Sequence, residues 1–411
     1  MKTVYTNIRV GLYMCLSLLI FSCKKSETLP NRIATVKVFP ADSQAQNMGV
    51  TRLQDGTMIL FGFSSDTGGY IGNQLMKCDH NGNQIWVKHL TKESEQVWIC
   101  NAHPIGDHDF IVIGWSWSIT QSDLFTARYD GNGKLIWKET ITDSDLNLYP
   151  IASMIDREGN ISIISRFGNK LLLARWNPNG GQILNQAISV EVPPNPNNTG
   201  DLDPYSMTED KATGDFFIFS DFLYSGNSNA SYYLTYNTMV HRISNKGEPR
   251  WLGYRRDSLN SQSIAGILYR DNVVHTFVNV GLNQAGLTPF FGDKTYGQIY
   301  HEQWDSSGAF LSSEALAGLP QNTYFNQVLP TSDGGFLLSG TTNLFSSGYT
   351  LNAKMMVAKL NSSFKAEWQK LVDTRSQSFG MQSFEADGAY FTSGSHVVGN
   401  KVQFQMVVKT Q

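Results

Sequence analysis

The residues that could act as acids, bases or metal ligands are scattered along this chain rather than gathered in a motif. Asp201, Asp203 and Asp221 are carboxylates that could meet across neighbouring structural units, as paired acids do in glycoside hydrolysis. Neither a Gly-x-Ser-x-Gly elbow nor a phosphate-binding loop is present. The histidines lack the spacing of metal ligands, so the sequence predicts no metal and no cofactor. The histidines are His80, His89, His103, His108, His241, His275, His301 and His396.

Aromatic side chains offer a second kind of chemistry, because flat apolar rings suit sugar rings or the side chains of a partner. They stand in segments that we expect to be long loops on one face of the fold. The alternative is that they cap the ends of structural units or fill the mouth of a channel. The candidate ligand- or partner-binding residues are Tyr70, Trp115, Trp117, Tyr224, Phe290, Phe291, Tyr296, Phe345 and Tyr349.

Two polar segments, residues 79–83 and 130–133, carry the Asp, Asn and Gly residues of a calcium loop. A calcium loop of the EF-hand type also needs a bidentate Glu at its twelfth position. Leu90 and Ile141 stand there instead. We therefore interpret both segments as tight hairpin turns, in which Asn and Gly accept a positive φ.

The elements that must position these residues follow from a phrase that recurs at roughly 50 residues, a period typical of β-propeller blades. One copy has Asp-His-Asp followed by an apolar run within residues 107–114, a second strand-like run at 124–130, and a turn leading into Trp137. Each copy predicts four antiparallel strands. Trp86, Trp137, Trp251 and Trp368 recur at one position of the repeat, which favours packing between blades over ligand contact.

Six complete copies are followed by a last one that stops after its third strand, at residues 402–409. Residues 33–39 have no blade of their own, and we expect them to supply the missing fourth strand. The sequence thus predicts an all-β, seven-bladed β-propeller with four-stranded antiparallel blades, closed by the N-terminal strand. Residues 32–411 would form one domain, with the Pro/Asn-rich segment 190–203 as a loop on the same face as the aromatic loops.

The N-terminus reads as an export signal. Lys2 and Arg9 precede an apolar run at residues 10–21 that is too short to span a bilayer. Residues 20–23, which include the end of this run and Cys23, resemble a bacterial lipobox. The alternative is an ordinary secretory signal. The resemblance implies a signal peptide at 1–22, a lipid on Cys23 and a tether at 23–31. Lys24, in place of Asp, implies sorting to the outer membrane of a Gram-negative cell.

The remaining composition agrees with an exported protein. The formal net charge of −3 gives no basic field that would attract nucleic acid. Once the signal and the lipidated residue are set aside, Cys78 and Cys100 remain. They fall in different blades, so two separate thiols are favoured over a disulfide, although the envelope is oxidising enough for one.

The repeats resemble those of secreted bacterial propellers with Asp-Gly-Gly and Asp-x-x-Gly-x-x-x-Trp signatures, and more loosely those of quinoprotein-like propellers. This resemblance implies the fold and leaves the activity open. We expect a non-catalytic binding or scaffold lipoprotein that meets a glycan, a peptide or an envelope protein through the aromatic loop face. A short tether would turn that face away from the membrane. The alternative is a glycan-degrading hydrolase or lyase with carboxylates at the channel mouth.

Overall fold

A computed structural model of the chain describes residues 34–38, 44–66, 69–90, 96–117, 122–143, 148–167, 170–190, 198–228, 231–255, 260–282, 296–320, 322–342, 353–372, 377–398 and 401–410. Residues 33–411 form one compact unit. The residues predicted to form the signal peptide and the tether, Cys23 among them, lie outside the described residues. Within the described part of the chain, no helix has the length and hydropathy needed to cross a membrane.

The described strands form seven four-stranded antiparallel sheets, which we call blades. Six blades each consist of four consecutive strands. The first three are blade 1 with β2 (Gln44–Arg52), β3 (Met58–Asp66), β4 (Gly69–Cys78) and β5 (Gln84–Leu90); blade 2 with β6 (Gln96–Ile105), β7 (Asp109–Trp117), β8 (Ser122–Tyr129) and β9 (Leu135–Asp143); and blade 3 with β10 (Leu148–Ile155), β11 (Ile161–Phe167), β12 (Lys170–Trp176) and β13 (Gln182–Ser189).

The next three blades follow the same order. They are blade 4 with β14 (Asn198–Glu209), β15 (Phe216–Ser228), β16 (Ser231–Ile243) and β17 (Pro249–Arg255); blade 5 with β18 (Asn260–Arg270), β19 (Val273–Leu282), β20 (Tyr296–Asp305) and β21 (Phe310–Ala315); and blade 6 with β22 (Thr323–Pro330), β23 (Phe336–Thr342), β24 (Lys354–Leu360) and β25 (Ala366–Val372).

The remaining sheet, the composite blade, joins both ends of the unit. It contains β26 (Gln377–Ala386), β27 (Ala389–Val398) and β28 (Lys401–Thr410), followed by β1 (Ala34–Val38) from the N-terminal side. Ala34 pairs with Thr410 and Val38 with Met406. The predicted closure by the N-terminal strand is confirmed, although the paired strand is shorter than residues 33–39.

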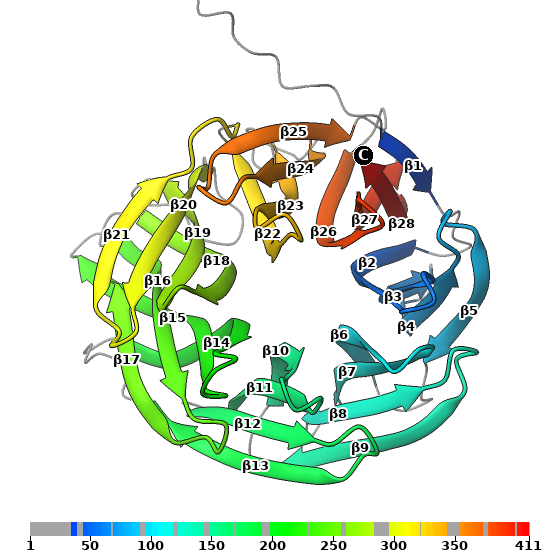
Figure 1. The fold of residues 1–411 in the computed structure, drawn as a ribbon, viewed down its shortest axis with the longest axis horizontal. Helices are drawn as coiled ribbons and strands as arrows, with labels where there is room; N and C mark the ends of the chain where they lie inside the picture. Colours follow the sequence, from blue (N-terminus) through cyan, green and yellow to red (C-terminus); the bar gives the residue numbers. More distant parts are fainter. Residues whose placement is uncertain are drawn as a thin grey trace, which may run out of the picture. The chain divides into compact units, whose positions relative to one another are not determined.

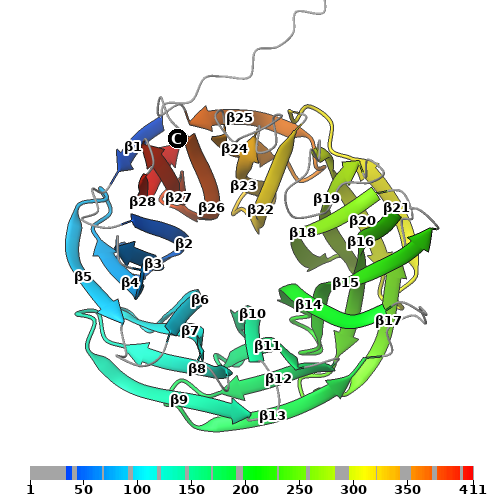
Figure 2. The ribbon, with the colours of Figure 1, turned by 180° about the vertical axis from the view of Figure 1, so that it is seen from behind.

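The blades stand side by side around a central axis, with the first strand of each blade innermost and the fourth outermost (Figures 1 and 2). Two faces of this ring are distinct. The turns between first and second strands and between third and fourth strands lie on one face, which we call the turn face. The hairpins between second and third strands lie on the opposite face, which we call the hairpin face.

The hydrophobic core lies between neighbouring blades. Phe61 and Leu75 of blade 1 cluster with Phe110 and Val112 of blade 2, and similar clusters join the following pairs as far as blade 6. Because both faces of a blade pack against neighbours, its middle strands are buried on both faces rather than on alternate residues. β23 (Phe336–Thr342), for example, is buried at every position.

The repeated turns are built by their first side chain. In blade 1 the carboxylate of Asp79 accepts hydrogen bonds from the backbone N–H groups of Asn81 (2.8 Å) and Asn83 (2.7 Å). Gly82 takes a φ of 74°, which is open to glycine at little cost. Asp130 forms the same bonds in blade 2. The interpretation of both segments as hairpin turns is confirmed.

A recurring contact joins neighbouring blades at the turn face in three of the junctions. Lys77 Nζ (2.9 Å) and Trp86 Nε1 (3.3 Å) both donate to the carbonyl oxygen of Gly131 in blade 2. The carbonyls of Pro178 and Ser306 accept similar pairs of bonds, from Arg128 with Trp137 and from Arg242 with Trp251. Trp368 packs beside Tyr390 of the composite blade. The predicted role of these tryptophans in packing between blades is confirmed.

Candidate functional site

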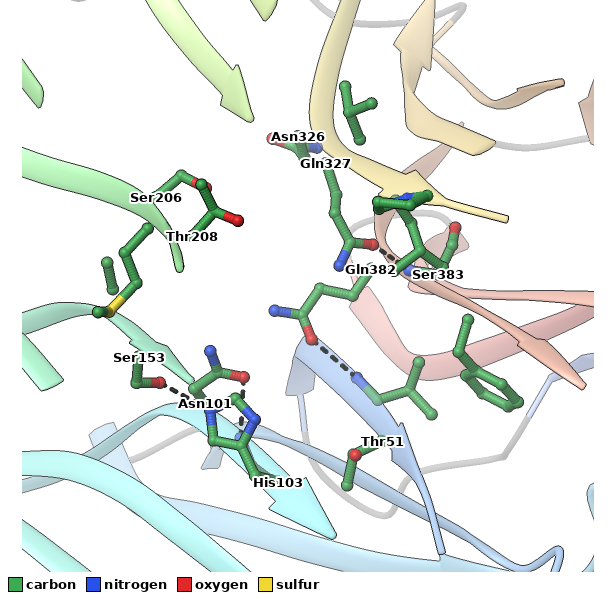
Figure 3. A pocket seen from close by; sticks show the side chains of 18 of the residues that line it. Thr51, Asn101, His103, Ser153, Ser206, Thr208, Asn326, Gln327, Gln382 and Ser383 are labelled. Carbon is green, nitrogen blue, oxygen red and sulfur yellow. Dashed lines mark hydrogen bonds between the residues drawn. The ribbon is translucent and has the colours of Figure 1, made fainter. Parts of the chain in front are cut away.

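The candidate site is a central cavity of about 750 Å³, enclosed by the first strands of all seven blades. Its lining comes from the C-terminal halves of these strands, which lead into the turns of the turn face. The wall is mostly neutral. Polar side chains in it include Asn101, Gln327, Gln382, Ser206 and Thr208 (Figure 3).

A β-bulge interrupts every first strand at the same level. The pairing with the second strand skips a residue between Asn47 and Gly49 in blade 1 and between Ile99 and Asn101 in blade 2. Corresponding shifts occur in the other five first strands. A bulge bends its strand and leaves backbone groups without a ladder partner. Those groups need other hydrogen-bond partners, because they face the interior.

Side-chain amides accept hydrogen bonds from three backbone N–H groups that follow the bulged positions of these first strands. Gln382 Oε1 accepts a hydrogen bond from the backbone N–H of Val50 in blade 1, at 3.2 Å. Gln327 Oε1 of blade 6 accepts one from the backbone N–H of Ser383 in the composite blade. Asn101 Oδ1 accepts one from the adjacent backbone N–H of Ala102, at 3.0 Å. Two of the three amides therefore also tie neighbouring blades together.

Two titratable groups in the cavity wall, His103 and Cys100, are held in their neutral forms. Burial lowers the pKa of His103 to about 4, and its Nε2 lies 2.9 Å from Ser153 Oγ of blade 3. Burial raises the pKa of the Cys100 thiol to about 12, against a smaller opposing effect of its hydrogen bond with Trp115. At neutral pH the imidazole is therefore uncharged and the thiol is protonated.

The charged residues of the lining are engaged with neighbours. Glu385 is the only carboxylate among the described lining residues, and it accepts hydrogen bonds from the backbone N–H and the hydroxyl of Ser332 (2.5 and 2.7 Å). Arg52 pairs with Asp387 at 2.6 Å. The described residues also hold no group of three or more His, Cys, Asp or Glu able to bind a metal. The acid cluster expected of a hydrolase is not found in this wall.

The structure corrects the assignment of several aromatic residues to loops. Trp115 lies within β7 and stacks on Trp98 of β6, with ring centroids 5.7 Å apart. The other candidate aromatics lie in strands, near their ends, or outside the described residues. Trp117, Tyr70, Tyr224 and Tyr296 belong to strands β7, β4, β15 and β20, whereas Phe290, Phe291, Phe345 and Tyr349 lie outside the described residues.

Trp115 is not among the residues that line the described cavity. The carboxylates Asp203 and Asp221 are register partners within blade 4 rather than neighbours across two blades. The segment predicted as a Pro/Asn-rich loop is also shorter than expected, because β14 already begins at Asn198. Cys78 and Cys100 are not bridged to each other.

Sequence reasoning missed the amide residues of the cavity. The available signal was weak: Asn101, Gln327 and Gln382 are polar residues inside segments that otherwise read as strands. The sequence does not show that a bulge turns them toward the axis.

Comparison with known proteins supports the fold and leaves the function open. No protein-family model and no curated protein sequence matches the chain. Among solved structures, an ulvan lyase of polysaccharide lyase family PL25 has a TM-score of 0.57 at 9% identity, over 89% of this chain and 95% of its own.

Two further structures are similar. An inactive variant of virginiamycin B lyase from Staphylococcus aureus with quinupristin has a TM-score of 0.52 at 10% identity, over 92% and 99% of the two chains. The polysaccharide lyase Uly1 has a TM-score of 0.51 at 9% identity, over 90% of both. At these identities the likeness establishes a β-propeller fold only.

Proposed function

We propose that this protein is a binding module that takes a segment of a glycan into the central cavity. The observation that carries the proposal is the wall itself: first strands from all seven blades enclose about 750 Å³ with neutral polar side chains. Ligand sites are commonly concave and mostly pre-formed, with a few directed polar groups, and the volume is in their usual range. This proposal replaces the aromatic loop face by the cavity as the binding region.

The chemistry of the wall favours binding over catalysis. A hydrolase needs paired carboxylates, and Glu385 is alone and bonded to Ser332. A thiolate nucleophile needs a low thiol pKa, whereas burial raises that of Cys100 to about 12. These features support a ligand that is held and not cleaved.

The test is to fill the cavity. Ser206 lies in its wall, so Ser206→Trp should abolish retention of oligosaccharides that the wild-type protein binds on a glycan array. Ser189→Trp adds the same bulk on the exposed outer strand β13 and should bind like wild type. Equal binding by wild type and Ser206→Trp would overturn the cavity as the site. Selective capture of peptides rather than glycans would overturn the ligand class.

A glycan lyase is the second candidate function, because two of the similar structures are polysaccharide lyases. A lyase needs a base that removes the proton from the carbon that bears the sugar's carboxylate, so that the glycosidic oxygen can leave from the adjacent carbon. His103 is the one imidazole in the described cavity wall, and its low pKa keeps it unprotonated at neutral pH. Formation of unsaturated sugar products by wild type, and their loss in His103→Ala, would favour the lyase over the binding module.

We further propose that the protein is a lipoprotein of the outer membrane, anchored through Cys23. The support is the lipobox-like sequence at residues 20–23 and the apolar run before it. Ala34, the first residue of β1, lies at the turn-face end of the composite blade, since it pairs with Thr410 at the end of β28. Anchoring would therefore bring the turn face, on whose side the cavity lies, toward the membrane.

Anchoring is tested separately from ligand binding. Cys23→Ala should move the protein from the membrane fraction to the soluble fraction and remove the lipid mass from the mature N-terminus. Unchanged membrane association of this variant, without lipid on the wild-type protein, would overturn the proposal.

A further inference from the structure

Three side-chain amides in the cavity have an orientation that hydrogen bonding determines. The backbone N–H groups of Val50, Ser383 and Ala102 are donors, so the amide atom that each contacts must be the oxygen. The NH₂ groups of Gln382, Gln327 and Asn101 are therefore turned the other way. Figure 3 shows these three nitrogens directed into the open space between the blades.

These NH₂ groups have no hydrogen-bond partner among the described residues. Each carries two N–H donors, so the wall presents three amide donor groups to a ligand, from blade 6, the composite blade and blade 2. Asn326 differs, because its Nδ2 donates to the carbonyl of Gly380 in the composite blade. The NH₂ groups of the three amides are thus free to donate to a ligand, and the oxygen contacts hold the amides in place.

No described acidic group competes for these donors within the cavity. Glu385 is bonded to Ser332, and Thr208 and Ser206 on the wall of blade 4 carry neutral hydroxyls. A neutral sugar hydroxyl would bring a proton that needs an acceptor, whereas a carboxylate only accepts. Hydrogen bonds to an ionised acceptor are also shorter and stronger than neutral ones.

We propose that the cavity selects its glycan through a carboxylate, so that the ligand is a polymer containing uronic-acid residues. The NH₂ groups of Gln382, Gln327 and Asn101 donate to the carboxylate oxygens. Ile264 and Ala265 of β18 in blade 5 also line the cavity and provide apolar surface for the C–H face of a sugar ring. This inference rests on the proposed glycan-binding function and narrows it to an acidic substrate class.

Substitution of Gln by Glu tests the inference with little change in shape. In Gln382→Glu and Gln327→Glu, one carboxylate oxygen can still accept the backbone N–H of Val50 or Ser383. The other oxygen replaces a donor by a negatively charged acceptor that faces the ligand. We expect a loss of about tenfold or more in affinity for oligogalacturonate in each variant. The melting temperature should stay near that of wild type.

The probe is oligogalacturonate, compared with the same oligomer after complete methyl esterification, by isothermal titration calorimetry. Wild type should bind the acid at least about tenfold more tightly than the ester, and the Glu variants should lose that preference. Gln186→Glu adds the same charge on the exposed strand β13 and should leave the preference unchanged.

The outcomes separate this inference from the function on which it rests. If acid and ester bind equally, or if the Glu variants bind the acid like wild type, the carboxylate assignment is wrong even where Ser206→Trp abolishes binding. If wild type binds neither oligomer but retains other glycans in a Ser206-dependent way, the inference fails and the glycan-binding function stands. If it retains no glycan, both fail.

Discussion

Trp251 of blade 4 lies so close over Gly308 of blade 5 that a β-carbon on the glycine would come within 2.5 Å of the indole ring. The same turn also offers the carbonyl oxygen of Ser306 to Trp251 Nε1, at 2.7 Å. Each such turn therefore has two functions. Its glycine accepts a positive φ and, without a β-carbon, lets the indole ring pack directly against the backbone. Its carbonyl oxygen holds the neighbouring blade in register.

This relationship predicts different costs for two glycine-to-alanine substitutions. Gly308→Ala combines an unfavourable φ of 89° with the clash against Trp251. We expect it to destabilise the protein by about 2–4 kcal/mol, the sum of backbone strain and overpacking. Gly388→Ala is the control, because its φ is 69° and nothing lies within 4 Å of its β-carbon.

The control should lose only about 1–2 kcal/mol in the free energy of unfolding. Urea denaturation measures both values. If the two variants are equally stable, the packing of Trp251 on the turn does not contribute to the junction between the blades.

The ion pair inside blade 3 predicts a large effect from one arginine. Arg175 Nη2 lies 2.5 Å from Asp156 Oδ2, and the two side chains are only 6% and 0% exposed. Arg175→Met would leave a buried carboxylate without its partner, at a cost of about 3–5 kcal/mol. The double variant Asp156→Asn, Arg175→Met should recover part of this loss in stability. Thermal unfolding of the single and double variants measures the difference.

The matched control is Arg52→Met. Arg52 forms its ion pair with Asp387 at the surface, where the side chains are 28% and 79% exposed. Exposed pairs contribute about 0–1 kcal/mol, so the control should melt close to wild type. A similar loss in both variants would show that burial does not govern these pairs.

Much of this fold could be predicted from the sequence because the repeat depends on local chemistry. The Asp-x-x-Gly turn needs a side-chain acceptor at its start and a residue with positive φ, and both are visible as letters, as in Asp79 and Gly82. The closing strand could be predicted because the last repeat lacks a fourth strand. The basic residue before the turn, such as Lys77 or Arg128, also recurs in the sequence but was not recognised.

The cavity could not be predicted in the same way. The residues skipped at the bulges include Met48, Cys100 and Asn326, which share no chemical type. Their common position follows from strand curvature around the axis, which is a property of the whole ring. Strand pairing likewise overrides local preference at Asn198, because the long partner β15 extends β14 into a segment rich in Pro and Asn.

The pKa values of the turn-face carboxylates predict acid sensitivity. Burial alone would raise the pKa of Asp55, but hydrogen bonds from Thr57 and His108 and the charge of Lys77 lower it to about 2. Burial of Asp156 is likewise outweighed by hydrogen bonds from Arg175, Asn160 and Ser162, so its pKa also falls below the usual value. A carboxylate with a depressed folded-state pKa contributes stability above its unfolded pKa, near 4.

That stability should be full above pH about 4 and should fall as the pH drops from there toward about 2, through the folded-state pKa values. Urea midpoints measured from pH 7 to pH 2 test this window. In Asp55→Asn the slope within the window should be smaller than in wild type, because one group with a depressed pKa is removed. An unchanged slope would contradict the assignment to Asp55.

The closing strand predicts which engineered cysteines can meet. Val36 of β1 and Val408 of β28 are register partners. Opposed residues of antiparallel strands have Cα atoms about 4.5–5.5 Å apart, within the range that a disulfide can span. The pair Val36→Cys, Val408→Cys should therefore oxidise to a disulfide that links the two ends of the ring and raises the melting temperature.

Val36→Cys with Val407→Cys is the control, because neighbouring residues in a strand point to opposite faces of the sheet. Peptide mass spectrometry of the non-reduced protein identifies the bridge; cross-linking in the control pair alone would show that the strand closes the ring in a different register.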